Sequence, residues 1–440
     1  MKKVLIANRG AIARRLIRAF GELGLESIVL YSDADAGAPY LTEASSAIRM
    51  EGNLPSDTYL NASAILEIAK KHKVDAIHPG YGFLSENTDF ARQASESGIT
   101  FIGPEPRLIE RMGEKVNGRR EMEGYGFPVF PGSQALSIDM NLEELTSAIG
   151  FPLVVKPSGG GGGIGMQVVN RQEELAGAID RARAVAEKAF SDSTLYLEKW
   201  IEKPRHVEFQ VIGDGRGGCI HAFDRECSVQ RRHQKLIEES PTPKIDESNL
   251  RKQAQLAADV CGKMKYGSLG TIETLFLSGG GFGFLEMNTR IQVEHGVTEE
   301  VTGLDLVKMQ MSLFMGDELP AQDSVTRTGF AMEARLYAED PETMFPSTGK
   351  LQTFTVPALY GVRVETGYQV NQIVSPYYDP LLAKVIARGD TREQAIGRLS
   401  VALRAFDVSG VKTNAALLQK VLTSEDFLLG KIDTGLLNRL

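Results

Sequence analysis

The sequence predicts a mixed protein with α/β and α+β parts, and three features support this prediction. Strands and helices alternate from the N-terminus to Ile102, which is typical of an open parallel sheet. A glycine-rich loop follows the apolar strand that ends at Val155, and a hairpin of two apolar strands begins at Thr271. After Pro204 the chain contains longer stretches of strand character. We therefore expect the N-terminal part to differ in architecture from the rest.

Each element is predicted from the spacing of its apolar residues and from the glycine, proline and asparagine residues that bound it. In the N-terminal part, strands are expected at Val4–Ala7, Ser27–Tyr31, Ala76–Ile77 and Ile99–Ile102, and helices at Ile12–Phe20 and Ala62–Lys71. Further along, strands are expected at Pro152–Val155 and Leu195–Glu198, and helices near Glu114–Gly124, Gln172–Ala189 and Leu304–Leu313. From Gly329 onward we expect a final α+β portion.

The composition argues against several function classes. The net charge of −8 is unlike that of proteins that bind nucleic acids generally, which are basic. No run of about eighteen apolar residues exists, so no membrane span is expected. The three cysteines lack CxxC spacing and the start lacks a signal peptide's apolar core, which indicates a cytoplasmic protein with reduced thiols. The N-terminal turns contain no GxGxxG pattern, so a dinucleotide site is not favoured.

The hairpin that begins at Thr271 brings carboxylates together. Its strands, Thr271–Leu277 and Phe282–Met287, are joined by Ser278–Gly281. Folding that is symmetric about this turn places Glu273 across from Glu286, with Asn288 and Arg290 on the face of Glu286. Facing carboxylates repel each other, and Mg²⁺ between them would remove the repulsion, with amide and phosphate oxygens completing its shell. The alternative is a register shifted by one residue, which turns one glutamate to solvent.

The glycine-rich loop KPSGGGGG spans Lys156–Gly163. Consecutive glycines let backbone amides approach an anion closely, and the lysine supplies a positive charge for phosphate oxygens. The chain contains no Walker motif. Because the loop lies between an apolar strand and Met166–Val169, we expect a hairpin lid over phosphates in preference to a flexible loop. Cations in Arg205–Glu208 and Glu226–Lys235 indicate a neighbouring anion site, with a solvated surface as the alternative.

Longer motifs of the chain resemble those of the biotin carboxylase family. They are Ala7-Asn8-Arg9-Gly10, HPGYGFLSEN (His78–Asn87), FIGP (Phe101–Pro104), the glycine loop at Lys156, RHVEFQ (Arg205–Gln210), ECSVQRRHQK (Glu226–Lys235), EMNTRIQVEH (Glu286–His295), ARLYAEDP (Ala334–Pro341), YYDPLLAK (Tyr377–Lys384) and GVKTN (Gly410–Asn414). The resemblance covers essentially the whole chain. It implies an ATP-grasp fold with an N-terminal Rossmann-like domain (1–112), an ATP-grasp domain (113–325) with a glycine-rich lid subdomain (128–203), and a biotin carboxylase C-terminal domain (326–440).

The resemblance also implies roles for individual residues. It implies ATP contacts at Lys115, Lys156, Gly161, Gly162, Gly163, Glu198, Lys199, Ile201, His206 and His233. It implies Mg²⁺ ligands at Glu273, Glu286 and Asn288, with Mn²⁺ as an alternative metal. Bicarbonate is expected at Arg290, Gln292, Val293 and Lys235, and biotin at Tyr81, Arg335 and Asp379. The expected catalytic residues are Glu294, Arg335, Arg290 and Lys235, with Glu294 as the base and Arg335 stabilising the biotin enolate.

The implied reaction is ATP- and bicarbonate-dependent carboxylation of biotin through carboxyphosphate, the first half-reaction of a biotin-dependent carboxylase. A biotin-bearing lysine is expected in an Ala-Met-Lys-Met-like turn, and Met264-Lys265-Tyr266 is the only near match. We therefore expect biotin to arrive on a separate biotin carboxyl carrier protein and a carboxyltransferase to be another subunit. The resemblance also implies a homodimer.

Four features depart from the family pattern. Ile164 stands where the glycine loop usually has a basic residue, Ala11 replaces a glutamate, and Gly296 replaces a proline. Residues 367–372 lack the usual glycine–tyrosine pattern. These departures leave two alternatives open: an ATP-grasp ligase or carboxylase with a non-biotin acceptor, and a nucleotide-binding regulatory homologue.

Overall fold

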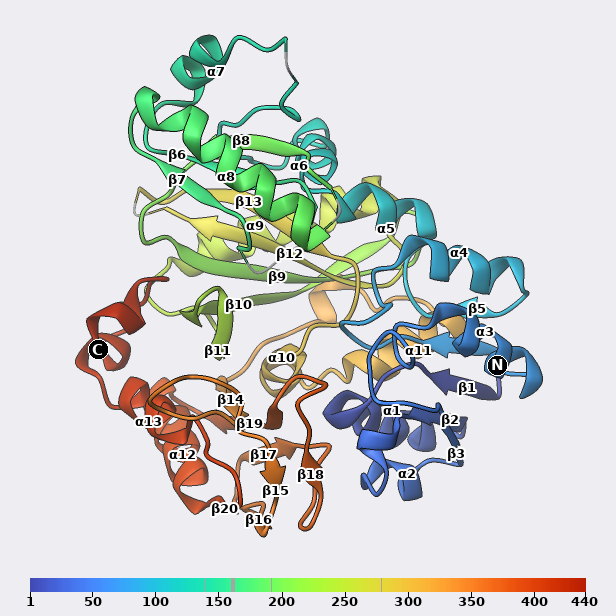
Figure 1. Cartoon of the computed structure of the whole chain (residues 1–440). Helices are drawn as coiled ribbons and strands as arrows, with labels where there is room; N and C mark the ends of the chain where they lie inside the picture. The colour runs from blue at the N-terminus through green and yellow to red at the C-terminus, as the bar shows by residue number, and fades with distance from the viewer. Residues whose placement is uncertain (138, 160–162, 191, 278) are drawn as a thin grey trace.

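The computed structural model describes the chain from Met1 to Leu440 except residues 138, 160–162, 191 and 278. Figure 1 shows the N-terminal part in blue on one side, the green lid at the top, and the C-terminal part in orange and red below, around a central sheet. Among the described helices, none is long and apolar enough to cross a membrane.

A five-stranded parallel sheet forms the N-terminal part, in the order β3-β2-β1-β4-β5. Its strands are β1 (Lys3–Ile6), β2 (Glu26–Tyr31), β3 (Ser46–Arg49), β4 (Ala76–His78) and β5 (Thr100–Phe101), and its helices are α1 (Gly10–Glu22), α2 (Tyr40–Glu43), α3 (Ala62–Lys71), α4 (Thr88–Glu96) and α5 (Pro106–Gly113). The prediction of alternating strands and helices is therefore confirmed. The predicted elements do not include β3, because its residues are partly exposed and show no apolar alternation.

The lid is a small three-stranded antiparallel sheet packed on one long helix. Its elements are α7 (Leu142–Ile149), β6 (Leu153–Pro157), β7 (Gln167–Val169), α8 (Gln172–Phe190) and β8 (Leu195–Lys199), and it is preceded by α6 (Lys115–Gly124), which packs with α5 and β13. Strand β6 pairs with both β7 and β8. The β6–β7 pairing confirms the expected hairpin. Of the loop that joins these strands, Gly161 and Gly162 lie outside the described residues.

An eight-stranded antiparallel sheet in the order β13-β12-β9-β10-β11-β14-β19-β17 forms the centre of the molecule. Its strands are β9 (Arg205–Gly213), β10 (Cys219–Arg231), β11 (Gln234–Ser240), β12 (Leu269–Phe276), β13 (Phe282–Asn288), β14 (Phe330–Tyr337), β17 (Val362–Glu365) and β19 (Leu381–Gly389). The sheet continues through the β11–β14 pair across the predicted domain boundary at 325/326. The domain limits therefore stay predictions.

Helices and short strand pairs complete the molecule. They are α9 (Glu247–Lys263), α10 (His295–Thr302), α11 (Leu306–Met315), α12 (Arg392–Ala405), α13 (Ala415–Leu422), α14 (Glu425–Leu428), β15 (Gly349–Lys350) with β18 (Ile373–Val374), and β16 (Thr353–Thr355) with β20 (Asp407–Ser409). Short 3-10 helices lie at Asp33–Asp35, Gln322–Ser324 and Leu436–Arg439. In the C-terminal core, Leu399 of α12 packs with Val385 of β19, as expected of an α+β portion.

The hairpin β12–β13 has the predicted carboxylate pairing but not the predicted symmetry. Glu273 and Glu286 are directly opposite, whereas Phe276 pairs with Phe282 nearer the turn, one residue away from the symmetric register. A bulge at Leu285 accounts for the difference. The amide of Phe284 donates to the carbonyl of Pro128 at 2.8 Å, outside the hairpin. This contact on the outer side of β13 explains why a symmetric turn alone does not give the register.

The atypical segment 367–372 packs against the N-terminal part. A Cβ atom at Gly367 would lie only 2.3 Å from the Cα of Gly10, so this approach requires glycine. The side-chain amide of Gln369 donates to the carbonyl of Gly37 at 2.9 Å. The changed sequence therefore lies at the junction between the first and last parts of the chain.

His78, at the end of β4, is fully buried and is expected to make stability depend on pH. Its Nδ1 accepts from the amide of Gly80 at 3.0 Å, and burial lowers its pKa from 6.5 to about 4. The unfolded chain therefore binds the proton first, and stability is lost as pH falls from 6.5 towards 4. Between pH 7.5 and 5 this one group should contribute a loss of about 2 kcal/mol.

The test is urea denaturation of wild type and His78→Gln at both pH values. The variant should lose about 2 kcal/mol less than wild type on acidification, because glutamine does not titrate. The comparison with wild type is essential, because the raised pKa of Glu333, about 8, makes stability change in the opposite direction with pH. An equal loss in both proteins would contradict the assignment of a neutral His78.

Candidate active site

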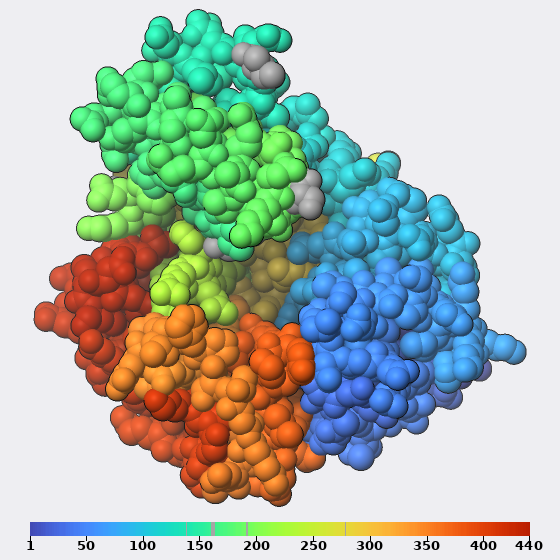
Figure 2. Space-filling model, viewed as in Figure 1, coloured from blue at the N-terminus to red at the C-terminus, as the bar shows by residue number. Residues whose placement is uncertain are grey.

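A cavity of about 720 Å³ opens where the three parts of the molecule meet, in the hollow visible at the centre of Figure 2. The ends of β1 and β4 supply one wall, as expected for the carboxyl edge of a parallel sheet. The cavity gathers most predicted site residues: Tyr81, His206, His233, Lys235, Glu273, Glu286, Asn288, Arg290, Gln292, Val293, Glu294, Arg335 and Asp379.

A smaller cavity of about 130 Å³ lies under the lid. It is lined by the predicted ATP contacts Lys115, Lys156, Gly163, His206 and His233, and by the facing carboxylates Glu273 and Glu286. Because His206, His233, Glu273 and Glu286 line both cavities, the two are parts of one site. The structure therefore brings together the predicted nucleotide, metal and bicarbonate positions.

Three predicted ATP contacts have other surroundings in the described part of the chain. Glu198 forms a buried ion pair with Lys156, and the ammonium group of Lys199 donates to the carbonyls of Gly150 and Phe151. Together with the half-buried Ile201, these residues line neither cavity. Their role in nucleotide binding stays a prediction.

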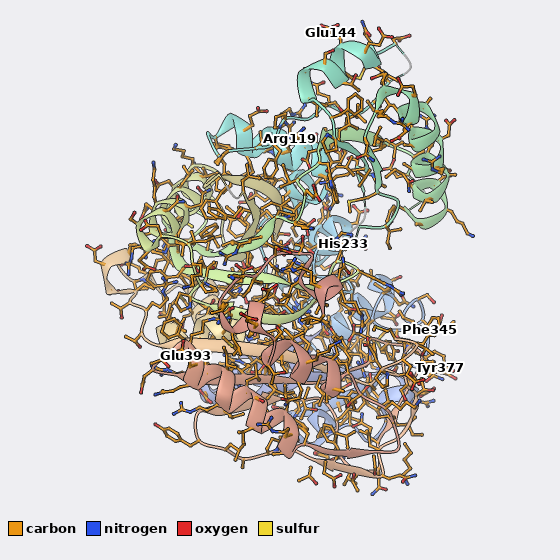
Figure 3. The ribbon with its side chains drawn as sticks, turned by 90° about the vertical axis from the view of Figure 1, so that its left-hand side faces the viewer. Arg119, Glu144, His233, Phe345, Tyr377 and Glu393 are labelled. Carbon is orange, nitrogen blue, oxygen red and sulfur yellow. The ribbon has the colours of Figure 1, made fainter. Side chains whose placement is uncertain are left out.

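His233 connects the lid to the central sheet. It lies at the tip of the β10–β11 hairpin, and Figure 3 shows it between the lid and the rest of the molecule. A Cβ atom at Gly163 would lie 2.4 Å from the His233 ring, so only glycine permits this contact at a φ of 72°. Burial and the nearby charges of Lys156 and His206 lower the pKa of His233, so the imidazole is neutral at physiological pH.

Lys235 is the centre of a buried carboxylate cluster. Its ammonium group lies 2.6 Å from Glu208, 2.8 Å from Glu273 and 2.6 Å from Glu294. Burial disfavours the charged lysine, but the three carboxylates outweigh this effect and raise its pKa well above the usual value. Lys235 therefore stays charged and holds the three acids in fixed positions.

Glu294 is fully buried at the start of α10 and lies between two cations. One of its oxygens accepts from Lys235 at 2.6 Å and the other from Arg335 at 2.9 Å. Burial opposes ionisation, but Lys235, Arg335 and Arg225 outweigh it and lower the pKa of Glu294. The predicted base is therefore ionised and able to accept a proton.

The predicted bicarbonate residues form a connected group beside Glu294. Arg290 donates to Asn288 at 2.8 Å and to the carboxylate of Glu86 at 2.9 Å. Gln292 donates to Glu273 at 3.0 Å, and the carbonyl of Val293 accepts from Lys384 at 2.6 Å. These contacts fix the segment after β13 while its side chains line the cavity.

The predicted biotin residues lie on the wall nearest the N-terminal part. The side-chain amide of Asn8 donates to the backbone carbonyl of Tyr81 at 2.8 Å. Burial raises the pKa of the Tyr81 phenol, which therefore stays protonated. Asp379 is exposed at the border of the cavity, and partial desolvation by its neighbours raises its pKa. Together with Arg335 they border the larger cavity.

Several residues of the site were not predicted from the sequence. Arg225 is fully buried and ion-pairs with Glu208, and it donates to Gln210 at 2.8 Å. Glu86 anchors Arg290, and Glu238 pairs with Arg335 at 2.7 Å. The alternation of His206, Glu208 and Gln210 with apolar residues along β9 is a signal from which the role of Glu208 is predictable.

The residues around Glu273 and Glu286 fit a magnesium ion. Lys115 lies 2.8 Å from Glu286, and the imidazole of His206 lies 2.8 Å from Glu273, close enough for an ion pair although not aligned for a hydrogen bond. Asn288 donates its amide to Glu273 at 2.9 Å, so the amide has to turn for its oxygen to face a metal. Two carboxylates and one amide oxygen suit Mg²⁺.

The departures Ile164, Ala11 and Gly296 lie at or near the site. Ile164 is 52% exposed and borders the cavity under the lid, where it offers no charge to a phosphate. Ala11 borders the larger cavity, and Gly296 lies in the first turn of α10 against Ile386. None of the three displaces a residue of the carboxylate cluster.

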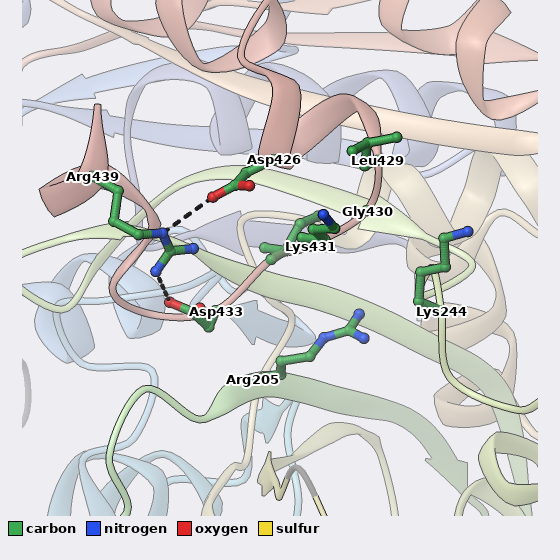
Figure 4. A pocket seen from close by; sticks show the side chains of 9 residues that line it. Arg205, Lys244, Asp426, Leu429, Gly430, Lys431, Asp433 and Arg439 are labelled. Carbon is green, nitrogen blue, oxygen red and sulfur yellow. Dashed lines mark hydrogen bonds and ion pairs between the residues drawn. The ribbon is translucent and has the colours of Figure 1, made fainter.

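A separate cavity of about 650 Å³ lies beside the C-terminal end of the chain. Figure 4 shows Arg439 between Asp426 and Asp433, to which it is paired at 3.2 and 2.8 Å, with Arg205 nearby. None of the residues that line this cavity is a predicted site residue. We assign no catalytic role to it.

Three family profiles match consecutive parts of the sequence. They describe the N-terminal domain of biotin carboxylase (residues 1–109), the ATP-binding domain of the carbamoyl-phosphate synthase L chain (residues 114–322) and the C-terminal domain of biotin carboxylase (residues 333–439). Together they cover nearly the whole chain.

Characterised relatives and solved structures agree with these profiles. The chain is 45% identical to a biotin carboxylase of Halalkalibacterium halodurans over 436 residues, which cover 99% of this chain and 96% of the relative. It is also 45% identical to biotin carboxylase 2 of Bacillus subtilis, with 99% of both chains covered.

The fold matches the biotin carboxylase of Campylobacter jejuni, solved as a β,γ-ATP complex, with a TM-score of 0.97 and 40% identity over 100% of this chain and 99% of that chain. It also matches the biotin carboxylase domain dimer of the Hydrogenobacter thermophilus 2-oxoglutarate carboxylase, solved with MgADP, ADP and bicarbonate, with a TM-score of 0.95 and 42% identity over 100% and 97% of the two chains. The predicted ATP-grasp fold is confirmed, and this chain belongs to the biotin carboxylase family.

Proposed function

We propose that this chain catalyses the ATP- and bicarbonate-dependent carboxylation of biotin through carboxyphosphate. The observation that carries the proposal is the position of Glu294, a buried carboxylate held between Lys235 and Arg335 in the wall of the larger cavity. The facing pair Glu273 and Glu286 lies in the same cavity. A base, two fixed cations and a metal-binding pair are the groups that this reaction needs.

Bicarbonate binds beside Glu294, against Arg290, Gln292 and the backbone of Val293. In the free site both oxygens of Glu294 accept from cations, which makes it a weak base. When bicarbonate binds, its negative charge also interacts with Lys235. The attraction between Lys235 and Glu294 then weakens, and the pKa of Glu294 rises. Glu294 then takes the proton of bicarbonate, whose oxygen attacks the γ-phosphoryl group of ATP. The bond to the β-phosphate breaks, which gives carboxyphosphate and ADP.

The lid residues bind and shield the phosphates. Lys156 and Lys115 supply positive charge to the phosphoryl oxygens, and the neutral His233 supplies a hydrogen bond without adding repulsion to these lysines. Mg²⁺, held by Glu273, Glu286 and Asn288, neutralises phosphate charge when it is bound. Lid closure excludes water, which protects carboxyphosphate from hydrolysis.

Biotin lies between Tyr81, Asp379 and Arg335. Breakdown of carboxyphosphate releases CO2 and leaves phosphate as the base for the ureido nitrogen. The guanidinium group of Arg335 stabilises the enolate oxygen that forms, because it is permanently charged and offers paired donors. Carboxylation of the ureido nitrogen completes the half-reaction.

The decisive experiment measures ADP release with Mg-ATP, with and without bicarbonate and with and without high free biotin. Stimulation that requires both additions supports the proposal. Bicarbonate-dependent release without any response to biotin favours an ATP-grasp enzyme with a different acceptor. ATP binding without release favours the regulatory alternative.

Biotin is proposed to arrive on a separate biotin carboxyl carrier protein, with the carboxyltransferase on another polypeptide and with this chain as a homodimer. Support comes from a relative that is itself one component of a larger enzyme, the small subunit of 2-oxoglutarate carboxylase from Hydrogenobacter thermophilus, and from the dimeric domain of that carboxylase. Mass spectrometry of the purified chain tests the first point. Biotin covalently attached to this chain would contradict a separate carrier.

A further inference from the structure

Arg335 is held on one edge by a carboxylate that does not line the cavity. Its Nε and Nη2 atoms lie 2.7 and 2.5 Å from the same oxygen of Glu238, and Nη2 also lies 2.9 Å from Glu294. Glu238 is fully buried in β11, whereas Arg335 borders the cavity. Glu238 therefore holds the guanidinium on the side that faces away from the cavity, and the opposite edge stays available for a ligand.

Glu238 has a second buried carboxyl group beside it. It pairs in register with Glu333 of the neighbouring strand β14, and both are fully buried. Within the described residues, both oxygens of Glu333 and the second oxygen of Glu238 have no hydrogen-bond partner. Two facing ionised acids would repel each other, so this arrangement requires a proton on one of them.

The surroundings indicate which acid carries that proton. Burial raises the pKa of Glu333 to about 8, and Lys384 opposes this rise only from 3.7 Å. Burial also raises the pKa of Glu238 to about 7, but Arg335 opposes this at hydrogen-bond distance. Because Arg335 contacts Glu238 at hydrogen-bond distance and Lys384 lies 3.7 Å from Glu333, the geometry favours the proton on Glu333 and the ionised form of Glu238, which holds Arg335.

We propose that Glu238 is a positioning residue for the biotin step. It fixes Arg335 so that the guanidinium can contact the biotin enolate while it stays paired with Glu294. This inference rests on the proposed function. Without an ionised Glu238, Glu294 is the only carboxylate among the described residues that still pairs with Arg335, and the guanidinium turns towards it and away from biotin. The formation of carboxyphosphate does not need the contact between Arg335 and biotin, so it should be affected less than the biotin step, and the two half-steps should become uncoupled.

The chain supplies a matched control in the next residue of the same strand. Glu239 is also buried and binds Nε and Nη2 of Arg392 at 2.6 and 2.9 Å, but neither residue lines the cavity. Glu238→Gln and Glu239→Gln each weaken one buried arginine pair. Only the first changes the group that is proposed to contact biotin.

The test measures carboxybiotin formation and ADP release for wild type and both variants. Glu238→Gln should lower the kcat of carboxybiotin formation roughly ten- to a hundredfold, as expected for a misplaced group, and should raise the ADP formed per carboxybiotin. Its KM values for ATP and bicarbonate should stay within about twofold of wild type. Glu239→Gln should lower the melting temperature without changing the ratio of ADP to carboxybiotin.

A folded Glu238→Gln with wild-type coupling would overturn the inference, as would the same uncoupling in Glu239→Gln. If Glu238→Gln does not fold, Glu238→Asp keeps the charge at a shorter reach and should show partial uncoupling; full coupling would then overturn it. In an Arg335→Gln background, Glu238→Gln should cause no further change. Failure of the proposed function would look different, because the wild-type protein itself would then show no ADP release that requires both bicarbonate and biotin.

Discussion

Glu294→Gln is expected to lower bicarbonate-dependent ADP release roughly a hundred- to ten-thousand-fold, the range that general-base catalysis contributes. Glutamine cannot take the proton of bicarbonate, so the nucleophile is not formed. The change should leave the affinity for Mg-ATP nearly intact, because Glu294 does not border the cavity under the lid. The defect should therefore appear in kcat and not in the KM for ATP.

The measurement is steady-state ADP release over a range of bicarbonate concentrations, with nucleotide binding followed separately by calorimetry. Glu299→Gln is the matched control. Glu299 lies on the same helix, α10, and is buried in ion pairs with Arg15 and Arg363, yet it does not line the cavity. Bicarbonate-dependent turnover close to wild type in a folded Glu294→Gln would remove Glu294 from the role of base.

The hairpin illustrates what the sequence predicts and what it leaves open. The alternation of side chains and the short glycine-rich turn predict the facing pair of Glu273 and Glu286, and the structure confirms that pairing. The symmetric register near the turn is wrong, because a bulge at Leu285 shifts it by one residue, next to a contact between Phe284 and Pro128. Segments distant in sequence decide that contact, and local patterning does not contain it.

The buried charge cluster shows a second limit. Motif resemblance locates Lys235, Glu294 and Arg335, but Glu238 carries no sequence signal beyond an ordinary strand position. Its role follows from the β11–β14 pairing, which joins segments about a hundred residues apart and brings Arg335 within 2.7 Å. Pairing between distant strands is a property of the fold, so such positioning residues emerge only from the structure.

For the predicted nucleotide contacts, the sequence locates the residues but leaves their binding atoms open. Lys115, Lys156 and His233 border the cavity under the lid, and their contacts with ATP stay predictions. For Lys199 the side chain is engaged with backbone carbonyls at 3.2 and 2.9 Å. Residues near a strand end can contribute backbone groups instead of side chains to a ligand. A motif predicts the position of such a residue but not which of its atoms binds.

Glu286→Gln is expected to raise the Mg²⁺ concentration needed for half-maximal ADP release by about tenfold or more, equivalent to the loss of about 1.4 kcal/mol of metal binding. Glu286 is the cleaner of the two facing carboxylates to change. It is half-buried and forms an ion pair with Lys115 at 2.8 Å, whereas Glu273 also holds Lys235. The variant removes one metal ligand and the repulsion between the facing carboxylates.

A thermal measurement separates metal binding from catalysis. Without metal, Glu286→Gln should melt no lower than wild type, because relief of the repulsion offsets the weakened contact with Lys115. Addition of Mg²⁺ with a non-hydrolysable ATP analogue should raise the melting temperature of wild type more than that of the variant. Glu226→Gln serves as control, since Glu226 is buried against Arg205 in the same sheet and lines neither cavity. Identical Mg²⁺ titrations of wild type and Glu286→Gln, in turnover and in melting, would show that the metal binds elsewhere.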